Sequence, residues 1–462
     1  MKNKYNFYFI CLLFVAAAAY ICLGFNNAVW YDEAYTMAMI KHDFGEICRI
    51  TAQDVHPPLY YILLKAFTAP FGYSLFAAKL FSVISLILTA ALGYVKLSEF
   101  EDNKTGFIYS VMLLFLPIVS TFSVEVRMYS IAALFVTGCG LYAYGAYKSE
   151  NILDYIIFMM FGVLAAYTHY FALVSAGIIY IMLFIGCVKK KRLKNFMFCT
   201  AATVILYIPW LASFISQLAD KIQNEYWIEP ITVKTVLNYF NVWFKCGNIT
   251  GIYLIIIGII ALFAFISIVI NKKKFALYSA LVFVLTNAVG IAASAAVRPV
   301  FIERYAVPAI PLLLAAMAIG ISRIKILPVI VSVFFALGFA VNYPSAADIE
   351  YNASELGIEE TLKSEKYEAI ICYVDAHLYG VLSYYAPYTP IYRPKLSQGS
   401  PFENIYKLSS FNANDCKWAA LFLPSGSEVP QEISERFNAD FVKTVSTYGI
   451  ECDLYNLSLI HI

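Results

Sequence analysis

Long apolar runs separated by short polar segments occupy roughly the first three quarters of the chain. A helix needs about 20 apolar residues to cross a membrane, and eleven runs approach that length. We expect spans near residues 7–25, 75–95, 106–122, 128–147, 155–170, 171–188, 196–215, 251–270, 275–297, 305–321 and 326–342. The pattern predicts an α-helical polytopic membrane protein, with about 11 transmembrane helices in residues 1–342.

The first run is similar to a secretory signal peptide, because Lys2 and Lys4 precede it. However, its length of roughly 19 residues exceeds the usual apolar region of about 7–15 residues, and no Ala-x-Ala pattern follows Gly24. We therefore expect this run to remain in the protein as the first span.

The pattern changes at Tyr343, after which charged residues, prolines and glycines are spread evenly. Short apolar runs typical of buried strands alternate here with helical patterns. Strands are expected at residues 368–374, 418–424 and within 440–458, and helices at 353–366 and 429–438. We expect residues 343–462 to form a small C-terminal α/β domain.

The long loop of residues 26–74 mixes apolar and charged positions and is not a plain linker. Residues 36–50 combine apolar side chains with scattered charges, and residues 57–71 are largely apolar apart from Lys65. Both segments fit helices that lie in the membrane interface with their apolar sides toward lipid.

Composition agrees with this interpretation, since 61% of the residues are hydrophobic and only 14% are charged, against about 25% charged in an ordinary soluble domain. The net charge of +2 gives no reason to expect nucleic-acid binding. Most of the ten cysteines lie within apolar runs, where free cysteine packs as a small hydrophobe. Cys372, Cys416 and Cys452 fall in the polar tail, where the sequence leaves disulfide pairing open.

Basic residues in the short loops predict the orientation, because loops rich in Lys and Arg remain in the cytoplasm. The clusters at residues 189–194, 272–274 and 323–325 all fall on one side if the N-terminus is cytoplasmic. The loop 26–74 and the C-terminal tail are then extracytoplasmic. The alternative for these clusters is binding of an anionic partner.

Asp32 and Glu33 are adjacent carboxylates just past the first apolar run, in Trp30-Tyr31-Asp32-Glu33-Ala34. Carboxylates at the mouth of a bilayer are costly, which favours a functional explanation. On the extracytoplasmic side, such a group can accept a proton from an attacking hydroxyl. The structural alternative is helix N-capping, where the helix dipole stabilises an acid, and it would explain one of the two.

Asp54 and His56 precede Pro57 and Pro58, which suit the first turn of a helix and extend the residue before them. We expect Asp54 and His56 to face the same aqueous side as Asp32, and a capped helix start is the alternative. A further histidine, His169, lies at the tight turn between two spans. It could orient a sugar or a phosphate, or serve only the turn.

Arg127, Arg298 and Arg304 lie at turns on the extracytoplasmic side, where positive charge is normally sparse. Arginine is permanently charged and forms bidentate hydrogen bonds to phosphate. We therefore interpret these residues as phosphate ligands, and ion pairing with Glu125 and Glu303 is the alternative.

The sequence lacks the motifs typical of several other kinds of catalytic or binding site. There is no GxxxxGK[ST], GxGxxG or HExxH motif, and the five histidines include no i, i+4 pair that would favour zinc. No Asp-x-Asp occurs, a pattern that commonly holds the divalent ion of a nucleotide-sugar donor, so a lipid-phosphate donor is favoured. A divalent cation held by Asp32 and Asp54 is compatible with the sequence, which does not require one. Tyr226, Trp227 and Trp243 fit either sugar stacking or a membrane-interface role.

Taken together, these motifs resemble the membrane glycosyltransferases of the C-type fold, in the protein O-mannosyltransferase and aminoarabinose-transferase superfamily. The similarity is closer to the bacterial dolichyl-phosphate-mannose-protein mannosyltransferase-like members and covers about the first 340 residues. The matching pieces are Trp30-Tyr31-Asp32-Glu33-Ala34, His56-Pro57-Pro58-Leu59-Tyr60-Tyr61, Arg127-Met128-Tyr129, Tyr167-Thr168-His169-Tyr170, and Arg304-Tyr305 with Pro308. The first two, in order and about 20 residues apart, are fairly specific.

The resemblance implies a hexosyl- or pentosyltransferase that moves a sugar from a polyprenyl phosphate to a hydroxyl or amine, with inversion, on the extracytoplasmic face. The acceptor would be a glycan, a lipid or a protein, and the helices of the first loop would guide the lipid. Asp32 then corresponds to the general base or to a carboxylate that orients the acceptor, with Glu33 in support. The donor-phosphate role of Arg127, Arg298 and Arg304 follows in part from the charge argument above. The expected substrate-binding residues are Asp54, His56, Tyr60, Tyr61, Tyr129 and His169.

The competing class is a transporter or flippase of lipid-linked saccharides. We would expect its charged residues near the midplane of the spans, whereas here they cluster at the outer ends. A sensor or scaffold, with the tail as its binding module, is a third class.

Overall fold

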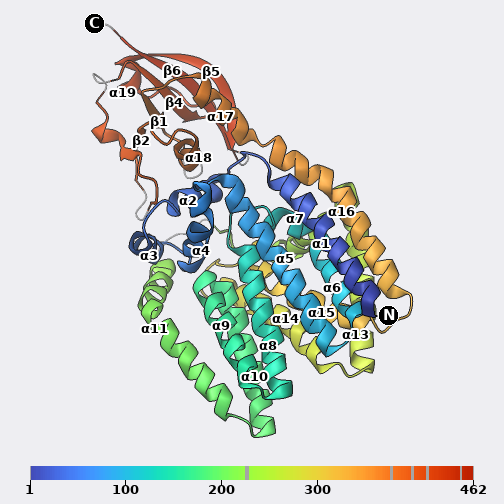
Figure 1. Cartoon of the computed structure of the whole chain (residues 1–462). Helices are drawn as coiled ribbons and strands as arrows, with labels where there is room; N and C mark the ends of the chain where they lie inside the picture. Colours follow the sequence, from blue (N-terminus) through green and yellow to red (C-terminus); the bar gives the residue numbers. More distant parts are fainter. Residues whose placement is uncertain are drawn as a thin grey trace.

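The helices formed by the apolar runs lie side by side in one bundle, and a sheet domain sits at one end of it (Figure 1). The computed structural model describes residues 2–223, 228–374, 378–396, 400–412, 416–447 and 450–460. The bundle contains α1 (Lys2–Gly24), α5 (Leu75–Phe100), α6 (Asn103–Phe115), α7 (Pro117–Phe122), α8 (Tyr129–Ser149), α9 (Ile152–Thr168), α10 (Tyr170–Lys190), α11 (Lys194–Gln223), α12 (Val233–Trp243), α13 (Thr250–Ile270), α14 (Lys274–Ala296), α15 (Ile310–Ile321) and α16 (Leu327–Tyr351), with the 3-10 helices η2 (Gly247–Ile249) and η3 (Glu303–Ala309).

Within the described ranges, nine helices are long and apolar enough to cross a membrane, and the chain is a multi-pass membrane protein. The other two predicted runs are helical but shorter. One is α9, with 17 residues, and the other is divided between α6, with 13, and α7, with 6. The division falls at Pro117, which lacks the N–H needed to continue a helix. The preceding Leu116 is extended, with φ −69° and ψ 129°, as proline requires.

Three short helices lie between the bundle and the sheet domain: α2 (Tyr31–Met39), α3 (Phe44–Ala52) and α4 (Leu59–Thr68), followed by η1 (Ala69–Phe71) (Figure 1). The segment 36–50 is therefore not one helix, because the Asp43 carboxylate accepts a hydrogen bond from the Glu46 N–H at 2.8 Å and starts a new one. We expected the apolar sides of the segments 36–50 and 57–71 to face lipid, and for most of their apolar residues this is wrong. Met37, Ile47 and Leu64 are fully buried, because the neighbouring helices and the sheet domain give them protein to pack against.

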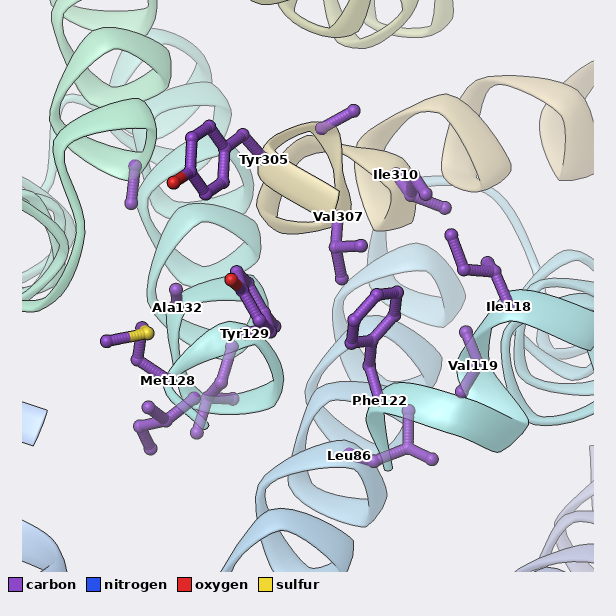
Figure 2. Close-up of a cluster of buried hydrophobic side chains, with 14 of the residues drawn as sticks. Leu86, Ile118, Val119, Phe122, Met128, Tyr129, Ala132, Tyr305, Val307 and Ile310 are labelled. Atoms are coloured by element: carbon purple, nitrogen blue, oxygen red, sulfur yellow. The ribbon is translucent and has the colours of Figure 1, made fainter. Parts of the chain in front are cut away.

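A buried apolar cluster fixes the segments that enter the candidate site. Figure 2 shows Leu86 of α5, Phe122 of α7 and Tyr129 at the start of α8 grouped around Val307 of η3. The contacts are tight: the rings of Phe122 and Tyr129 lie 5.0 Å apart, edge to face. Since Arg127 and Arg304 lie two and three residues from members of this cluster, its packing determines where both arginines project.

The C-terminal domain contains a six-stranded mixed sheet with the strand order β3-β2-β1-β4-β6-β5. The strands are β1 (Ala369–Cys372), β2 (Ile391–Arg393), β3 (Ile405–Lys407), β4 (Trp418–Pro424), β5 (Phe437–Thr447) and β6 (Ile450–Leu459). The first four pair in parallel, while β6 pairs antiparallel with both β4 and β5. The helices of this domain are α17 (Ser354–Ser364), α18 (Leu378–Tyr385), α19 (Gln431–Ser434) and the 3-10 helix η4 (Leu408–Ser410).

The expected α/β character is confirmed, with one local correction. The segment 429–438 forms only the four-residue α19, and β5 already begins at Phe437. Phe437 is buried and pairs with Leu459 in the sheet, so tertiary burial overrides the local helical pattern. Cys372, Cys416 and Cys452 are buried free thiols and are not paired.

The last bundle helix joins the two parts. α16 continues nine residues beyond position 342, to Tyr351. Near its end, the Glu350 carboxylate lies 2.7 Å from the buried Lys79 ammonium of α5 and accepts a hydrogen bond from Asn26 at 2.9 Å. A buried ion pair needs such extra hydrogen bonds to offset desolvation, and here it holds the start of the C-terminal domain against the first loop.

Candidate active site

Asp32 lies in the first turn of α2, not in a loop. The helix begins because Trp30 is extended, with φ −93° and ψ 174°, and the Glu33 side chain accepts a hydrogen bond from the Trp30 N–H at 3.4 Å. This is a helix-capping contact of the acid at the third helical position. The capping alternative therefore accounts for Glu33 and leaves the Asp32 side chain for other contacts.

Two arginines from distant parts of the chain converge on Asp32. The Oδ2 atom of Asp32 lies 3.7 Å from Nε of Arg127 and 3.6 Å from an Nη atom of Arg304. Arg127 comes from the turn before α8 and Arg304 from η3. The Asp32 side chain is 19% exposed, so water and a substrate can reach a carboxylate that is otherwise enclosed by cations.

Arg127 is buried and held by several groups. One Nη atom donates toward the Asp32 carbonyl at 3.4 Å and the Thr36 hydroxyl at 3.5 Å, and the other lies 3.1 Å from Nε2 of His56. A guanidinium can only donate, so Nε2 of His56 is the acceptor in that contact. Arg127 thus ties together α2, the bend before α4 and the start of α8.

Glu33 is buried, and its carboxylate accepts hydrogen bonds from backbone N–H groups. Its second carboxylate oxygen accepts from the Val126 N–H at 2.9 Å, which fixes the turn that carries Arg127. Burial raises the pKa of the Glu33 carboxyl, and burial raises the pKa of nearby Glu125 to about 8 despite the two arginines. Arg127 and Arg304 each lie within ion-pair distance of Asp32.

His169 lies beside the arginines as an uncharged ring. It is the N-cap of α10, where its Nδ1 accepts from the Phe171 N–H at 3.2 Å. Burial, with Arg127 and Arg304 nearby, lowers the pKa of His169 to about 3. Its ring stacks on His56 at 5.6 Å and meets Tyr305 edge-on at 5.1 Å. His169 therefore has a structural role in the turn and also forms part of the wall next to the arginines.

A cavity of about 220 Å³ opens beside this wall, between α10, α11 and α14. Its polar end is formed by His56, His169, Gln217 and Arg298. The remainder is apolar, lined by side chains that include Phe171, Val174, Phe214, Leu218, Val289 and Ala293. A ligand with an anionic head and a hydrocarbon chain would match this division.

Among the other predicted residues, Asp54 interacts electrostatically with the Tyr35 and Tyr61 side chains. Tyr60 and Tyr61 are fully buried, so they form the wall of the site rather than an open binding surface. The Tyr61 hydroxyl interacts electrostatically with Arg127, Asp54 and Asp32. Tyr129 is likewise buried and contacts the His169 ring at 5.8 Å.

The contacts of Trp30 and Gln217 in the site were not predicted from the sequence. The Arg304 guanidinium lies over the Trp30 ring, 5.6 Å from its centre, and Gln217 donates to the Thr51 carbonyl at 2.6 Å. A lone glutamine in an apolar helix is a usable signal for a polar contact inside a bundle. Trp243 is buried and donates to the Glu303 carbonyl at 2.9 Å, so it supports η3. Tyr226 and Trp227 lie outside the described residues.

No group of three or more metal-ligating side chains occurs within the described ranges. A cation site at Asp32 and Asp54 stays a sequence-based hypothesis.

The sequence matches no protein-family model and no curated protein. Solved structures do share its fold. ArnT from Cupriavidus metallidurans in the apo state matches with a TM-score of 0.70 and 10% identity, over 98% of each chain. The same protein bound to undecaprenyl phosphate matches with a TM-score of 0.69 and 11% identity, over 99% of this chain and 98% of that one. The apo oligosaccharyltransferase of Archaeoglobus fulgidus matches with a TM-score of 0.50 and 9% identity, over 91% of this chain and 70% of that one. The chain therefore has the C-type glycosyltransferase fold that its motifs predicted.

Proposed function

We propose that this protein is a membrane glycosyltransferase that moves a sugar from a polyprenyl phosphate to an acceptor hydroxyl or amine by an inverting displacement. The observation that carries the proposal is a reachable carboxylate, Asp32, held between Arg127 and Arg304 near an apolar cavity that enters the helical bundle. The shared fold with ArnT, one structure of which holds undecaprenyl phosphate, supports the donor class. The sugar, and whether the enzyme is a hexosyl- or pentosyltransferase, is left open.

The prenyl chain and the phosphate of the donor would occupy different parts of the cavity. Its prenyl chain would lie among the apolar side chains of α10, α11 and α14, which include Val174, Leu218 and Val289. Its phosphate would then meet Arg298 at the polar end, with Arg304 nearby through Tyr305. Guanidinium groups suit a phosphate because they offer paired donors and a permanent charge.

The reaction needs a base for the acceptor proton and cations that stabilise the negative charge on the leaving phosphate. Asp32 accepts the proton of the acceptor hydroxyl as its oxygen forms a bond to the anomeric carbon. The bond from that carbon to the phosphate oxygen breaks on the opposite face, and its electron pair leaves with the prenyl phosphate. The arginines stabilise the charge that develops on this leaving group. The protonated Asp32 then returns its proton to water.

Asp32 and the donor phosphate would both be anionic partners of the two arginines. Because Arg127 and Arg304 contact Asp32, the donor phosphate would compete with the carboxylate for the same cations. Arg127 would keep its place through Thr36 and His56. We infer that donor binding draws guanidinium contacts toward the phosphate and turns the Asp32 carboxylate toward the acceptor.

In the proposed enzyme, Glu33 is a positioning residue. It touches the backbone of Trp30 and Val126 and acts on catalysis by fixing α2 against the Arg127 turn. The expected substrate-binding residues fall into two groups. Asp54, His56 and His169 lie toward the polar part of the site, while Tyr60, Tyr61 and Tyr129 form its packed wall.

We propose that the site faces the extracytoplasmic side and that the N-terminus is cytoplasmic. Contacts at the lysine-rich end support this assignment, because Glu101 lies 2.6 Å from Lys273 and also pairs with Arg323, and Glu150 pairs with Arg192. Three of the predicted cytoplasmic loops therefore meet at Glu101 and the other two meet at Glu150. Positive loops favour the cytoplasm.

The C-terminal domain of residues 343–462 would support the catalytic helix. The hydroxyl of Tyr31, next to Asp32, lies 2.8 Å from the hydroxyl of Tyr379 in α18. We propose that residues 1–342 hold the transferase chemistry and that the sheet domain keeps α2 in place from the extracytoplasmic side.

The test uses the full chain in sealed lipid vesicles with a radiolabelled prenyl-phosphate sugar and a mixture of envelope acceptors. We expect release of free prenyl phosphate together with label on an acceptor. Redistribution of intact lipid-linked sugar across a vesicle membrane without any cleavage would support a transporter and overturn the proposal.

A further inference from the structure

A second cavity, of about 160 Å³, lies at the lysine-rich end of the bundle, between α8, α10 and α14. The side chains with polar groups that line it are Tyr144, Tyr147, Lys189, Lys274, Tyr278 and Ser279. It shares no residue with the cavity beside Asp32, and the proposed transfer reaction gives it no role.

The same pair of helices carries both cavities at its two ends. α10 and α14 lie side by side (Figure 1), with the Ser175 and Thr286 hydroxyls 2.9 Å apart between them. Phe171 lines the first cavity and Lys189 the second. Those 18 helical residues correspond to about 27 Å at 1.5 Å per residue. The second cavity is therefore at the level of the opposite membrane leaflet.

Several cations at this end of the bundle have protein partners, whereas Lys189 and Lys274, which line the cavity, have none among the described residues. Lys190 donates to the Tyr147 carbonyl at 2.7 Å, Lys273 pairs with Glu101, and Arg192 pairs with Glu150. Within the described part of the chain, neither Lys189 nor Lys274 has a carboxylate within 4.0 Å or a hydrogen-bond acceptor. Two ammonium groups without protein partners thus stand at the rim of one cavity.

The remainder of the cavity suits the glycerol and upper acyl region of a lipid. Its inner wall is apolar, with Leu183, Val282 and Leu312. At its outer edge, Ile185 is 47% and Tyr278 is 44% exposed, on helices that face the membrane. Tyrosine hydroxyls beside apolar surface are typical of the level where headgroups meet hydrocarbon.

We propose that this cavity binds the headgroup phosphate of an anionic glycerophospholipid from the lysine-rich leaflet, with its acyl chains against α10 and α14. Lys189 and Lys274 would contact the phosphate, and the Tyr278 side chain would lie along the glycerol. Basic pockets between spans recognise anionic lipid headgroups in this way. A soluble phosphate would leave the apolar wall of Leu183 and Val282 uncovered.

The experiment uses the full chain in nanodiscs that contain a photo-crosslinkable phosphatidylglycerol, with labelled peptides mapped by mass spectrometry. We expect labelling in residues 179–189 and 274–282, and much less with a matched phosphatidylcholine probe. In the double variant Lys189→Gln with Lys274→Gln, labelling should fall about tenfold or more, because each cation near the surface contributes to anionic-lipid binding.

A matched control changes the same number of lysines in the same region. Lys191 and Lys194 are exposed and do not line the cavity, so Lys191→Gln with Lys194→Gln should keep the labelling within about twofold. Equal loss in both double variants would mean that only the overall charge attracts the lipid, and would overturn the site. Equal labelling by phosphatidylcholine, or full displacement of the probe by inorganic phosphate, would overturn the anionic-lipid assignment. None of these readouts depends on sugar transfer.

Discussion

Asp32→Asn tests the proposed base most directly. Asparagine has nearly the same shape, so the first turn of α2 and its neighbours should remain in place. Arg127 would still donate to the residue 32 carbonyl, to Thr36 and toward His56. The change removes only the negative charge that both arginines contact and the ability to accept the acceptor's proton.

Two effects of opposite sign follow from the geometry. Loss of a general base should lower turnover by about 10²–10⁴-fold. At 3.6 and 3.7 Å, each arginine attracts the carboxylate with about 4–5 kcal/mol at an effective dielectric constant near 20, less the screening by water at the partly exposed side chain. Without that competitor, the arginines are available to an anionic ligand. If about 1.4 kcal/mol of this attraction is released, free prenyl phosphate should bind about tenfold more tightly.

The assay measures single-turnover release of prenyl phosphate in nanodiscs, and, separately, the equilibrium binding of unlabelled prenyl phosphate. Glu33→Gln is the matched control, one residue away, because Glu33 contacts backbone N–H groups and not the proposed substrates. We expect Glu33→Gln to lower thermal stability and to retain far more turnover than Asp32→Asn.

The reasoning would be refuted by an Asp32→Asn protein with near wild-type turnover. It would also be refuted if turnover and prenyl-phosphate affinity fell together, because that result would assign Asp32 to ligand binding or to folding.

Three further outcomes can be measured. Arg304→Gln should weaken prenyl-phosphate binding by about 10–100-fold, the value of a charged hydrogen bond, with Arg304→Lys in between; unchanged binding in a titration would contradict the phosphate role. Burial raises the pKa of the Glu125 carboxyl to about 8 from 4.5, so the folded protein binds the extra proton, and Glu125 contributes stability at low pH that is lost as pH rises toward 8. Glu125→Gln should therefore flatten the fall in Tm between pH 5 and pH 8, and an unchanged slope would contradict this. Gly93→Ala would place a Cβ in steric conflict with the Tyr109 ring and should destabilise by about 1–3 kcal/mol, measured by thermal unfolding. Gly177→Ala, which meets nothing within 4 Å, is its control, and equal losses would argue against the packing explanation.

The sequence by itself determined the class of this protein. Apolar runs of membrane-spanning length and a polar tail with strand patterns are local properties. Apart from the segment 429–438, helices and strands formed where those patterns lie. Pro117 is an instructive case. Its break in the run 106–122 follows from the chemistry of one residue, although the apolar pattern alone suggested a single span.

The tertiary structure decided the partners of each residue. The apolar sides of α2 and α3 were expected to face lipid, and they are buried because the sheet domain and the bundle enclose them. Asp32, Arg127 and Arg304 are separated by about 95 and 177 residues in the sequence, so no local pattern could state which carboxylate each arginine would meet.

The division between Asp32 and Glu33 was also invisible in the sequence, where they are equivalent neighbours. In a helix, successive side chains point about 100° apart, so one carboxylate turned inward to the Trp30 and Val126 amides and the other turned toward the arginines. The different roles of the two carboxylates follow from helical geometry and from the packing of α8 and η3 beside α2. Only the assembled bundle brings the two arginines to one side of α2.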